Sequence, residues 1–366
     1  MKTITIRTQS KQYPTMIGHG ASELLAPFLK DNFPSLTKLF IITDEHIHQL
    51  HFESFIEQLQ DFQSIVSYVV PNGEKAKTFE VYYQLLTFAL EQKLDRKSMI
   101  LSLGGGAVGD VSGFVAGTFM RGIPFVQIPT TILAHDSAVG GKVAINHPLG
   151  KNLIGVFHQP EAVIYDLNFL GTLPQKEKRS GFAEVFKEAL IADGQFYQWL
   201  LTHIDSLDSL SSDHLAYFLE QGMRIKGSIV AEDEKETGVR AFLNLGHTLG
   251  HAIEAELGYG QITHGEAVAI GTIFALRLSS ELLDLDFNHQ QLEDWLRKLG
   301  YRIDLPKQLD NNKLLNRMKL DKKSVGQNVH FVLLEKIGVP KMVEVQDVLL
   351  LQKLEEFKVK GEKMND

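Results

Sequence analysis

The chain has 366 residues, 44% of them hydrophobic and 22% charged, which is enough for a globular protein of two domains. It contains no cysteine, which excludes disulfides and thiolate metal ligands and favours a reducing cytoplasm. The formal net charge of −8 argues against unspecific binding to nucleic acid or to an anionic membrane surface, and no apolar run is long enough to span a bilayer. We therefore expect a cytoplasmic protein whose partners include neither nucleic acid nor membrane.

The first half of the chain alternates between predicted strands and predicted helices. Residues 1–7 alternate like a strand and lack the apolar stretch of a secretory leader. Further strands are predicted at residues 38–44, 64–71, 99–103 and 125–128, with helices at 79–93 and 108–119. This order is typical of a mostly parallel sheet with crossover helices, and it predicts a Rossmann-like α/β domain over residues 1–172.

A glycine-rich turn follows the strand predicted at residues 99–103. It matches G-x-G-x-x-G at Gly104, Gly106 and Gly109 and leads into a predicted helix. Such a turn lets backbone approach a pyrophosphate at a helix N-terminus, but it also serves merely to pack a helix against a strand. The acid usually found about 20 residues further on is missing. Both interpretations therefore stay open on this motif alone.

Polar residues follow other predicted strands. Asp44 ends one strand, and residues 71–77 end another with a turn, an acid and a base. Ligands of open α/β sheets collect beyond the carboxyl ends of the strands. We therefore expect one shared crevice for these groups, although ordinary loop residues would give the same pattern: Asp44, Glu74, Lys77, Gly106, Asp110, Thr130 and Thr131.

After about residue 172 the pattern becomes helical as far as residue 299, and a hairpin is predicted at residues 329–335 and 342–345. These segments predict a second, mostly α-helical domain over residues 173–366. Basic residues beside glycine, histidine or acidic signatures suggest a pocket for a small anionic ligand, although any one of them could be a solvated surface residue. They are Lys142, Lys151, Lys187, Lys226, Arg240, Lys322 and Lys323.

Three histidines occur within eighteen residues of the helical half. His247 and His251 share one helix face, and His264 follows two glycines that let the chain turn back. Glu184, on a helix expected to begin after Pro174, is the best further ligand. Two imidazoles and one carboxylate leave a coordination position open for substrate, as a catalytic zinc site requires. A single helical histidine is more often a packing or surface residue, but the group together predicts a metal centre.

Several motifs occur together in a specific order. They are P-N-G-E-K-A-K at 71–77, G-G-G-A-V-G-D at 104–110, Q-I-P-T-T at 127–131, G-G-K at 140–142, G-K-N at 150–152, A-E-V-F-K at 183–187, L-N-L-G-H-T at 243–248, H-G-E-A at 264–267 and D-K-K at 321–323. On these motifs the chain resembles the 3-dehydroquinate synthase family over essentially its whole length. It departs from the family's usual pattern in a segment at 133–139 that is one residue shorter, in Val143-Ala144, and in Glu188-Ala189.

The resemblance implies a nucleotide-binding α/β domain, a largely helical second domain, an active site between them and a homodimer. It implies conversion of 3-deoxy-D-arabino-heptulosonate 7-phosphate, a small anionic sugar-acid phosphate, into 3-dehydroquinate and phosphate. The cofactors implied are NAD, reduced and reoxidised within each turnover, and Zn²⁺ or Co²⁺. Two related activities stay open: another sugar-phosphate cyclase resembling 2-deoxy-scyllo-inosose synthase, and a metal-dependent polyol dehydrogenase. A non-catalytic binding protein on the same fold is a more remote alternative.

The resemblance also implies roles for particular residues. The metal ligands would be Glu184, His247 and His264. Catalytic roles would fall to Lys142, Lys187, Glu236, His251 and Asp136. The substrate would be bound by Asn152, Lys226, Arg240, Asn244, Lys322 and Lys323, with Arg121 reaching across the dimer. NAD would be bound by Asp44, Asn72, Gly73, Glu74, Lys75, Ala76, Lys77, Gly105, Gly106, Ala107, Val108, Gly109, Asp110, Thr130, Thr131, Lys142, Lys151, Phe169, Leu170, Gly171 and Thr172.

Overall fold

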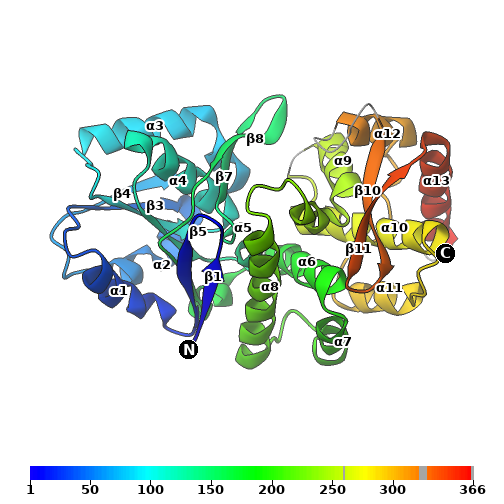
Figure 1. Ribbon diagram of the computed structural model, residues 1–366, viewed down its shortest axis with the longest axis horizontal. Coiled ribbons are helices and arrows are strands. Elements are labelled where there is room, and N and C mark those ends of the chain that lie inside the picture. Colours follow the sequence, from blue (N-terminus) through cyan, green and yellow to red (C-terminus); the bar gives the residue numbers. More distant parts are fainter. Residues whose placement is uncertain (259, 321–327, 364–366) are drawn as a thin grey trace. The chain divides into compact units, whose positions relative to one another are not determined.

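The structure, a computed structural model, describes residues 1–258, 260–320 and 328–363. The chain forms two compact units (Figure 1). The first unit comprises Met1–Leu173 and Leu215–Lys235, and the second comprises Pro174–His214 and Glu236–Asp366. Within the described ranges, no helix combines the length and the apolar character needed to cross a membrane.

The first unit contains a seven-stranded sheet in the order β1-β2-β9-β6-β5-β3-β4. Only β1 and β2 pair in antiparallel fashion, and every other neighbouring pair is parallel. The strands are β1 (Lys2–Arg7), β2 (Gln12–Gly18), β3 (Leu39–Asp44), β4 (Ile65–Val70), β5 (Met99–Gly104), β6 (Phe125–Pro129) and β9 (Ala162–Asp166). The predicted Rossmann-like architecture is thereby confirmed, and all five strands predicted in this sheet lie within two residues of their expected bounds.

Helices cover both faces of this sheet (Figure 1). Side chains of β3 alternate between the faces: Phe40 and Ile42 pack under α3 (Phe79–Glu91) and α4 (Gly106–Thr118), whereas Leu39 and Ile41 pack under α1 (Leu25–Asn32) and α2 (Glu45–Glu57). Because β3, β5 and β6 are buried on both faces, their sequences are mostly apolar on consecutive residues instead of alternating. This explains why these strands could be predicted from the sequence.

Three shorter elements complete the first unit. A separate antiparallel hairpin is formed by β7 (Lys142–His147) and β8 (Gly150–Phe157). A short helix, α5 (Ala134–Ser137), precedes it, and the 3-10 segments η1 (Ala21–Leu24), η2 (Gly73–Lys77), η3 (Phe119–Arg121) and η4 (Leu167–Thr172) connect the larger elements. The hairpin carries the predicted ligand-binding residues Lys142, Lys151 and Asn152.

One segment belongs to a different unit than the sequence indicates. Helix α8 (Ser212–Glu232) was predicted as part of the helical domain, but residues 215–235 pack with the first unit. Lys2 on β1 pairs with Glu220 at 2.5 Å, and Glu234 accepts hydrogen bonds from Ser10 and from the Gln159 side chain. These partners lie up to 224 residues apart, so a reading of local periodicity could not find them.

The second unit is mostly helical, as predicted, with the hairpin β10 (Val329–Lys336) and β11 (Val339–Val345) beside the helices. Its helices are α6 (Gln175–Ala192), α7 (Gly194–His203), α9 (His247–Leu257), α10 (His264–Leu282), α11 (His289–Lys298), α12 (Asn311–Leu320) and α13 (Asp347–Lys363). A 3-10 segment, η5 (Val239–Asn244), precedes α9.

Helices α6, α9 and α10 approach one another at glycines. A Cβ atom placed on Gly265 would lie 1.9 Å from the Ser180 carbonyl oxygen of α6, and one on Gly271 would lie 2.0 Å from the Gly246 carbonyl oxygen. Gly246 itself adopts φ of 80° just before α9, where a side chain would also collide with Thr272. These positions therefore exclude any side chain, and they bring the first residues of α9 and α10 close to α6.

We predict that Gly271→Ala lowers the free energy of unfolding of the second unit by about 1–3 kcal/mol or more, because the new methyl group meets backbone that is already packed. Gly194→Ala is the matched control, since its Cβ would make an ordinary contact at 3.5 Å with Ile337. Denaturant unfolding of both variants tests this. Equal stabilities of the two variants would contradict the packing argument.

Candidate functional site

The carboxyl ends of β3 and β5 mark the point where the strand order of the sheet reverses, because β3 pairs with β4 on one side and β5 on the other. Ligands of doubly wound sheets bind at such a point. Asp44 ends β3, Gly104 ends β5, and Thr130 follows β6. Asp44 and Thr130, two of the residues for which a shared crevice was predicted, therefore lie at the same edge of the sheet.

The glycine turn after β5 allows close packing between α4 and the sheet, which was one of the two interpretations of this motif. A Cβ on Gly104 would lie 2.6 Å from Val108, and one on Gly109 would lie 2.8 Å from the Gln127 side chain. The N-terminus of α4 is nevertheless suited to an anion, because its N-cap residue Gly105 makes no side-chain capping bond and its first turn contains no acid. Packing and anion binding are therefore compatible at this turn.

Buried hydroxyl groups surround this turn. Among the described residues, the side-chain oxygens of Thr43, Ser102, Thr130, Thr131 and Ser137 are buried and make no hydrogen bond. Thr131 and Ser137 lie against Gly105 and Gly106, within 2.9 Å of where a Cβ atom would stand. Buried hydroxyls are normally satisfied, so this set is suited to a polar ligand. Ser102 and Ser137 were not predicted, because neither belongs to a recognisable motif.

Asp44 and Asn72 hold the start of α2. The Asp44 carboxylate accepts from the backbone N–H of His46 and of Ile47, and the Asn72 side-chain oxygen also accepts from His46. Burial raises the pKa of Asp44, and these backbone hydrogen bonds oppose the rise. Asp44 thus has a helix-capping role that the sequence analysis did not consider.

A second polar group centres on Lys77, which is buried in η2. Its Nζ lies 2.5 Å from Asp110 on α4 and 2.5 Å from the Asn152 side-chain oxygen on β8. Glu74 accepts from Asn146, whose own oxygen accepts from the Asn152 N–H. Burial would lower the pKa of Lys77, but the Asp110 carboxylate outweighs it and raises the pKa. Lys77 is therefore a buried cation held between Asp110 on α4 and Asn152 on β8.

Lys226 and Asp136 form the third pair in the first unit. The Lys226 Nζ lies 2.9 Å from the Asp136 carboxylate and also donates to the Asp136 carbonyl oxygen. Lys226 comes from α8 and Asp136 from α5, so the unexpected position of residues 215–235 is what brings them together. Both were predicted as site residues, but not as partners.

The remaining predicted residues of the first unit lie at separate places. Residues 169–172 lie in η4, which is capped by Asp166 and contacted by His51 through the Thr172 hydroxyl at 2.9 Å. Neither Asp166 nor His51 was predicted. Arg121 ends η3 with left-handed φ of 68°, directly after Met120 at 50°. The other predicted residues of the nucleotide segments are Gly73, Lys75 and Ala76 in η2 and Ala107 and Val108 in α4.

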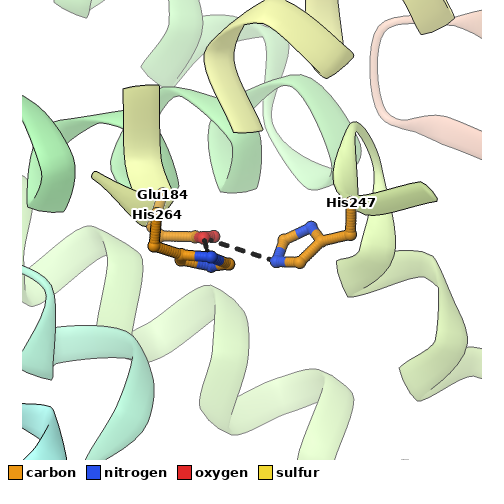
Figure 2. Close-up of side chains that lie close together, drawn as sticks. All are labelled: Glu184, His247 and His264. Atoms are coloured by element: carbon orange, nitrogen blue, oxygen red, sulfur yellow. Dashed lines mark ion pairs between the residues drawn. The ribbon is translucent and has the colours of Figure 1, made fainter. Parts of the chain in front are cut away.

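In the second unit, Glu184, His247 and His264 converge (Figure 2). The Nε2 atoms of His247 and His264 lie 3.4 Å and 3.2 Å from the same Glu184 oxygen, Oε1. Glu184 comes from the middle of α6, while the two histidines are the first residues of α9 and α10. The predicted trio is therefore assembled from three helices, and its ligand atoms all lie within 4.8 Å of one another.

The other ring nitrogens of both histidines have acceptors. His247 Nδ1 lies 3.2 Å from the Leu245 carbonyl oxygen, and His264 Nδ1 lies 3.0 Å from the Glu254 carboxylate. With a hydrogen kept on each Nδ1, the Nε2 atoms are the nitrogens left to bind a metal, and both face the Glu184 side. Two imidazoles and one carboxylate in this geometry are the donor set of a catalytic zinc-type site with an open position.

Charge is balanced around Glu184, which is buried. Lys187, one helical turn along α6, is buried as well and pairs with the Glu184 Oε2 atom. Burial alone would raise the pKa of Glu184, but Lys187 and His247 outweigh it and hold that pKa well below its usual range. Burial lowers the pKa of His247 to about 4. Burial also disfavours the charged form of His264, but hydrogen bonds to Glu184 and Glu254 raise its pKa to about 10.

Other predicted residues surround the trio at different distances. The His251 ring lies 5.2 Å from the ring of His247 and 5.9 Å from that of His264, so His251 borders the cluster. Asn244 donates to the Glu236 carboxylate at 3.3 Å, and Arg240 in η5 is buried. Lys322 and Lys323 lie outside the described residues. Glu254, which sequence analysis missed, lies three residues after His251 on the same helix.

A Rossmann-like sheet together with a Glu–His–His cluster is typical of α/β enzymes that combine a dinucleotide with a divalent metal. A family model described as 3-dehydroquinate synthase N-terminal matches residues 67–180, and one described as 3-dehydroquinate synthase C-terminal matches residues 181–324. The chain belongs to the 3-dehydroquinate synthase family, as the motifs predicted.

Named relatives match almost the whole chain. The 3-dehydroquinate synthase of Geobacillus kaustophilus is 53% identical over 361 residues, covering 98% of this chain and 99% of the relative. That of Bacillus cytotoxicus is 50% identical over 368 residues, covering 100% of both. These relatives agree with the family assignment over both units.

Solved structures show the same fold. A 2-deoxy-scyllo-inosose synthase complexed with carbaglucose-6-phosphate, NAD⁺ and Co²⁺ matches with a TM-score of 0.88 at 25% identity, over 97% of this chain and 100% of that one. A 2-epi-5-epi-valiolone synthase from Streptomyces hygroscopicus with NAD⁺ and Zn²⁺ bound matches at 0.85 and 22% identity, over 96% and 97%. A glycerol dehydrogenase from Schizosaccharomyces pombe matches at 0.69 and 13% identity, over 95% and 90%.

We predict that metal binding to this cluster becomes stronger as the pH rises from 6 to 8, by roughly tenfold per pH unit. In the metal-free chain His264 holds a proton because its pKa is raised to about 10, and a metal at Nε2 must displace that proton. His247, with a pKa of about 4, is already neutral in this range. Competition titrations of Zn²⁺ against a chelator would measure the slope, and an affinity independent of pH would contradict the protonation state.

Proposed function

We propose that this chain is a 3-dehydroquinate synthase, which converts 3-deoxy-D-arabino-heptulosonate 7-phosphate into 3-dehydroquinate and phosphate. Family membership supports the reaction, and the convergence of Glu184, His247 and His264 is the observation that carries it here. In this reaction a carbinol is oxidised, phosphate is eliminated from the acidified neighbouring carbon, the ketone is reduced again, and the opened ring closes by an intramolecular aldol step. Substrate and product therefore differ by loss of phosphate without net oxidation.

The metal part of the proposal rests on the donor set. Glu184, His247 and His264 would hold Zn²⁺ or Co²⁺, which would supply Lewis-acid chemistry by lowering the pKa of the substrate hydroxyl that is oxidised. Lys187 keeps the Glu184 carboxylate ionised and oriented. His251, beside both histidine rings, and Glu236, hydrogen-bonded to Asn244, are the proposed proton carriers.

The nucleotide part rests on the first unit. NAD, when bound, would accept a hydride and return it in the same turnover. The uncapped N-terminus of α4 would hold the pyrophosphate, and the buried hydroxyls beside it would receive hydrogen-bond partners. Asp44, Asn72 and residues 169–172 are proposed to hold the remaining parts of the nucleotide, as the family pattern implies. The first unit is thus the proposed nucleotide-binding unit and the second the metal-binding unit.

Substrate anions would be bound by fixed cations. Lys226 is held by Asp136, and Lys77 holds Asn152, so neither Lys226 nor Asn152 needs much reorganisation to bind a ligand. Arg240 and Asn244 are the corresponding groups of the second unit, and Lys142, Lys151 and Arg121 keep their predicted roles. A homodimer and a cytoplasmic location belong to the same proposal, supported by the family resemblance and by the absence of cysteine.

The reaction is tested by phosphate release from 3-deoxy-D-arabino-heptulosonate 7-phosphate with Zn²⁺ present and NAD far below the substrate concentration. We expect many turnovers per NAD, accumulation of 3-dehydroquinate and no lasting absorbance at 340 nm. Stoichiometric NADH would indicate a polyol dehydrogenase instead. No reaction would direct the search to sugar phosphates without a carboxylate, such as those used by other cyclases.

We predict that His264→Ala lowers the rate of phosphate release by about a thousandfold and abolishes tight Zn²⁺ binding, because a lost ligand removes several kcal/mol of transition-state stabilisation. The matched control is His203→Ala at the end of α7, because His203 is exposed and belongs to none of the described ion pairs. Phosphate release, metal content and circular dichroism are measured for both variants. Full turnover by a metal-free His264→Ala protein would overturn the metal role.

A further inference from the structure

Two groups of side chains in the second unit have the spacing of a metal site, and they share His264. One is Glu184, His247 and His264, and the other is His251, Glu254 and His264. Glu254 is a buried carboxylate on α9 that the proposed mechanism does not use. Its place in the second group raises the question whether it binds a metal directly or acts through His264.

The hydrogen bonds distinguish these two roles. An imidazole has two nitrogens, and the acceptor bound to one of them fixes which nitrogen offers its lone pair. Glu254 Oε2 lies 3.0 Å from His264 Nδ1, while His264 Nε2 lies 3.2 Å from Glu184. His247 has the same arrangement, with the Leu245 carbonyl oxygen as acceptor at Nδ1. Both Nε2 atoms therefore converge on Glu184, and the Glu254 carboxylate is occupied on the far side of the ring.

We propose that Glu254 is a positioning residue for the metal centre: it holds His264 in the Nδ1–H tautomer and aims Nε2 at the position shared with Glu184 and His247. The inference rests on the metal site of the proposed function. Carboxylates hydrogen-bonded to metal-binding histidines orient the ring and increase its basicity, and their loss typically weakens metal binding by about 10- to 100-fold.

The placement of Glu254 also links two helices. Glu254 and His247 are seven residues apart on α9 and so lie on the same side of that helix, whereas His264 begins α10. Helix α9 thus carries one proposed ligand and orients the other. The acceptors at the two Nδ1 atoms differ, because that of His264 is a charged carboxylate and that of His247 is a neutral backbone carbonyl. Loss of charge at residue 254 should therefore act through His264.

The test uses Glu254→Gln and Glu254→Ala in the full chain, with Zn²⁺ and Co²⁺ as the probes. Chelator competition gives the affinity, and the visible absorption of bound Co²⁺ reports ligand geometry independently of activity. We expect affinity to fall by about 10-fold for the Gln variant, which keeps an acceptor oxygen without its charge, and by up to about 100-fold for the Ala variant. Glu256→Gln is the matched control, since Glu256 on the same helix pairs with Arg317 at 2.6 Å.

Each outcome is decisive. Unchanged affinity and an unchanged Co²⁺ spectrum in both variants would overturn the inference. Two metal ions per wild-type chain, with one lost in Glu254→Gln, would make Glu254 a ligand and overturn it as well. If the wild-type chain binds no metal, the proposed function itself fails, which is a separate result. If the metal-free Glu254→Gln variant unfolds at the same temperature as the metal-free wild-type chain, a general loss of fold is excluded.

Discussion

The close contact of three helices at backbone level is the constraint on which the second unit depends. Gly265 lies against Ser180, and Gly271 against Gly246, at separations that leave no room for a methyl group. Because His247 follows Gly246 and His264 precedes Gly265, each proposed ligand adjoins one of these contacts in the sequence. The contacts that set the helix spacing therefore also set the distance between the two imidazoles and the Glu184 carboxylate.

This arrangement keeps several charged groups away from water, which is costly unless each is paired. Glu184 has Lys187 on one oxygen and two histidines on the other, and His264 has Glu254 on its second nitrogen. The first unit has ion pairs of its own, in which Lys77 pairs with Asp110 and Lys226 with Asp136. In both units, these buried charged residues predicted to bind ligands are each held by a neighbour of opposite charge.

The sequence was informative where a single local pattern decides the outcome. Strands β3, β5 and β6 are buried on both faces and therefore appear as mostly apolar runs. The spacing of His247, His251 and His264 indicated a metal site, for which Glu184 was the best further ligand. It was uninformative where the decisive contact is distant. Glu254 lacks a motif and acquires its role only when α9 packs beside α10, and residues 215–235 look like any amphipathic helix until Ser10 and Gln159 meet Glu234. The β7–β8 hairpin and strand β2 were likewise not predicted, because polar residues and glycines interrupt their apolar residues. Strand β9 was also missed, although its five residues are buried and mostly apolar.

Residues 215–235 belong to the first unit although they follow residues 174–214 of the second, and this affects the order in which the two units can fold during synthesis. The partner of Lys2 is Glu220, so a contact of the first strand waits until more than two hundred further residues have been made. Residues 174–214, which belong to the second unit, precede Glu220 in the chain and therefore leave the ribosome before it. Domains usually fold one after another as they are synthesised. Here the first unit cannot be completed before the second has begun, so a chain cut after residue 173 would lack α8, the lysine that pairs with Asp136 and the acid that Ser10 binds.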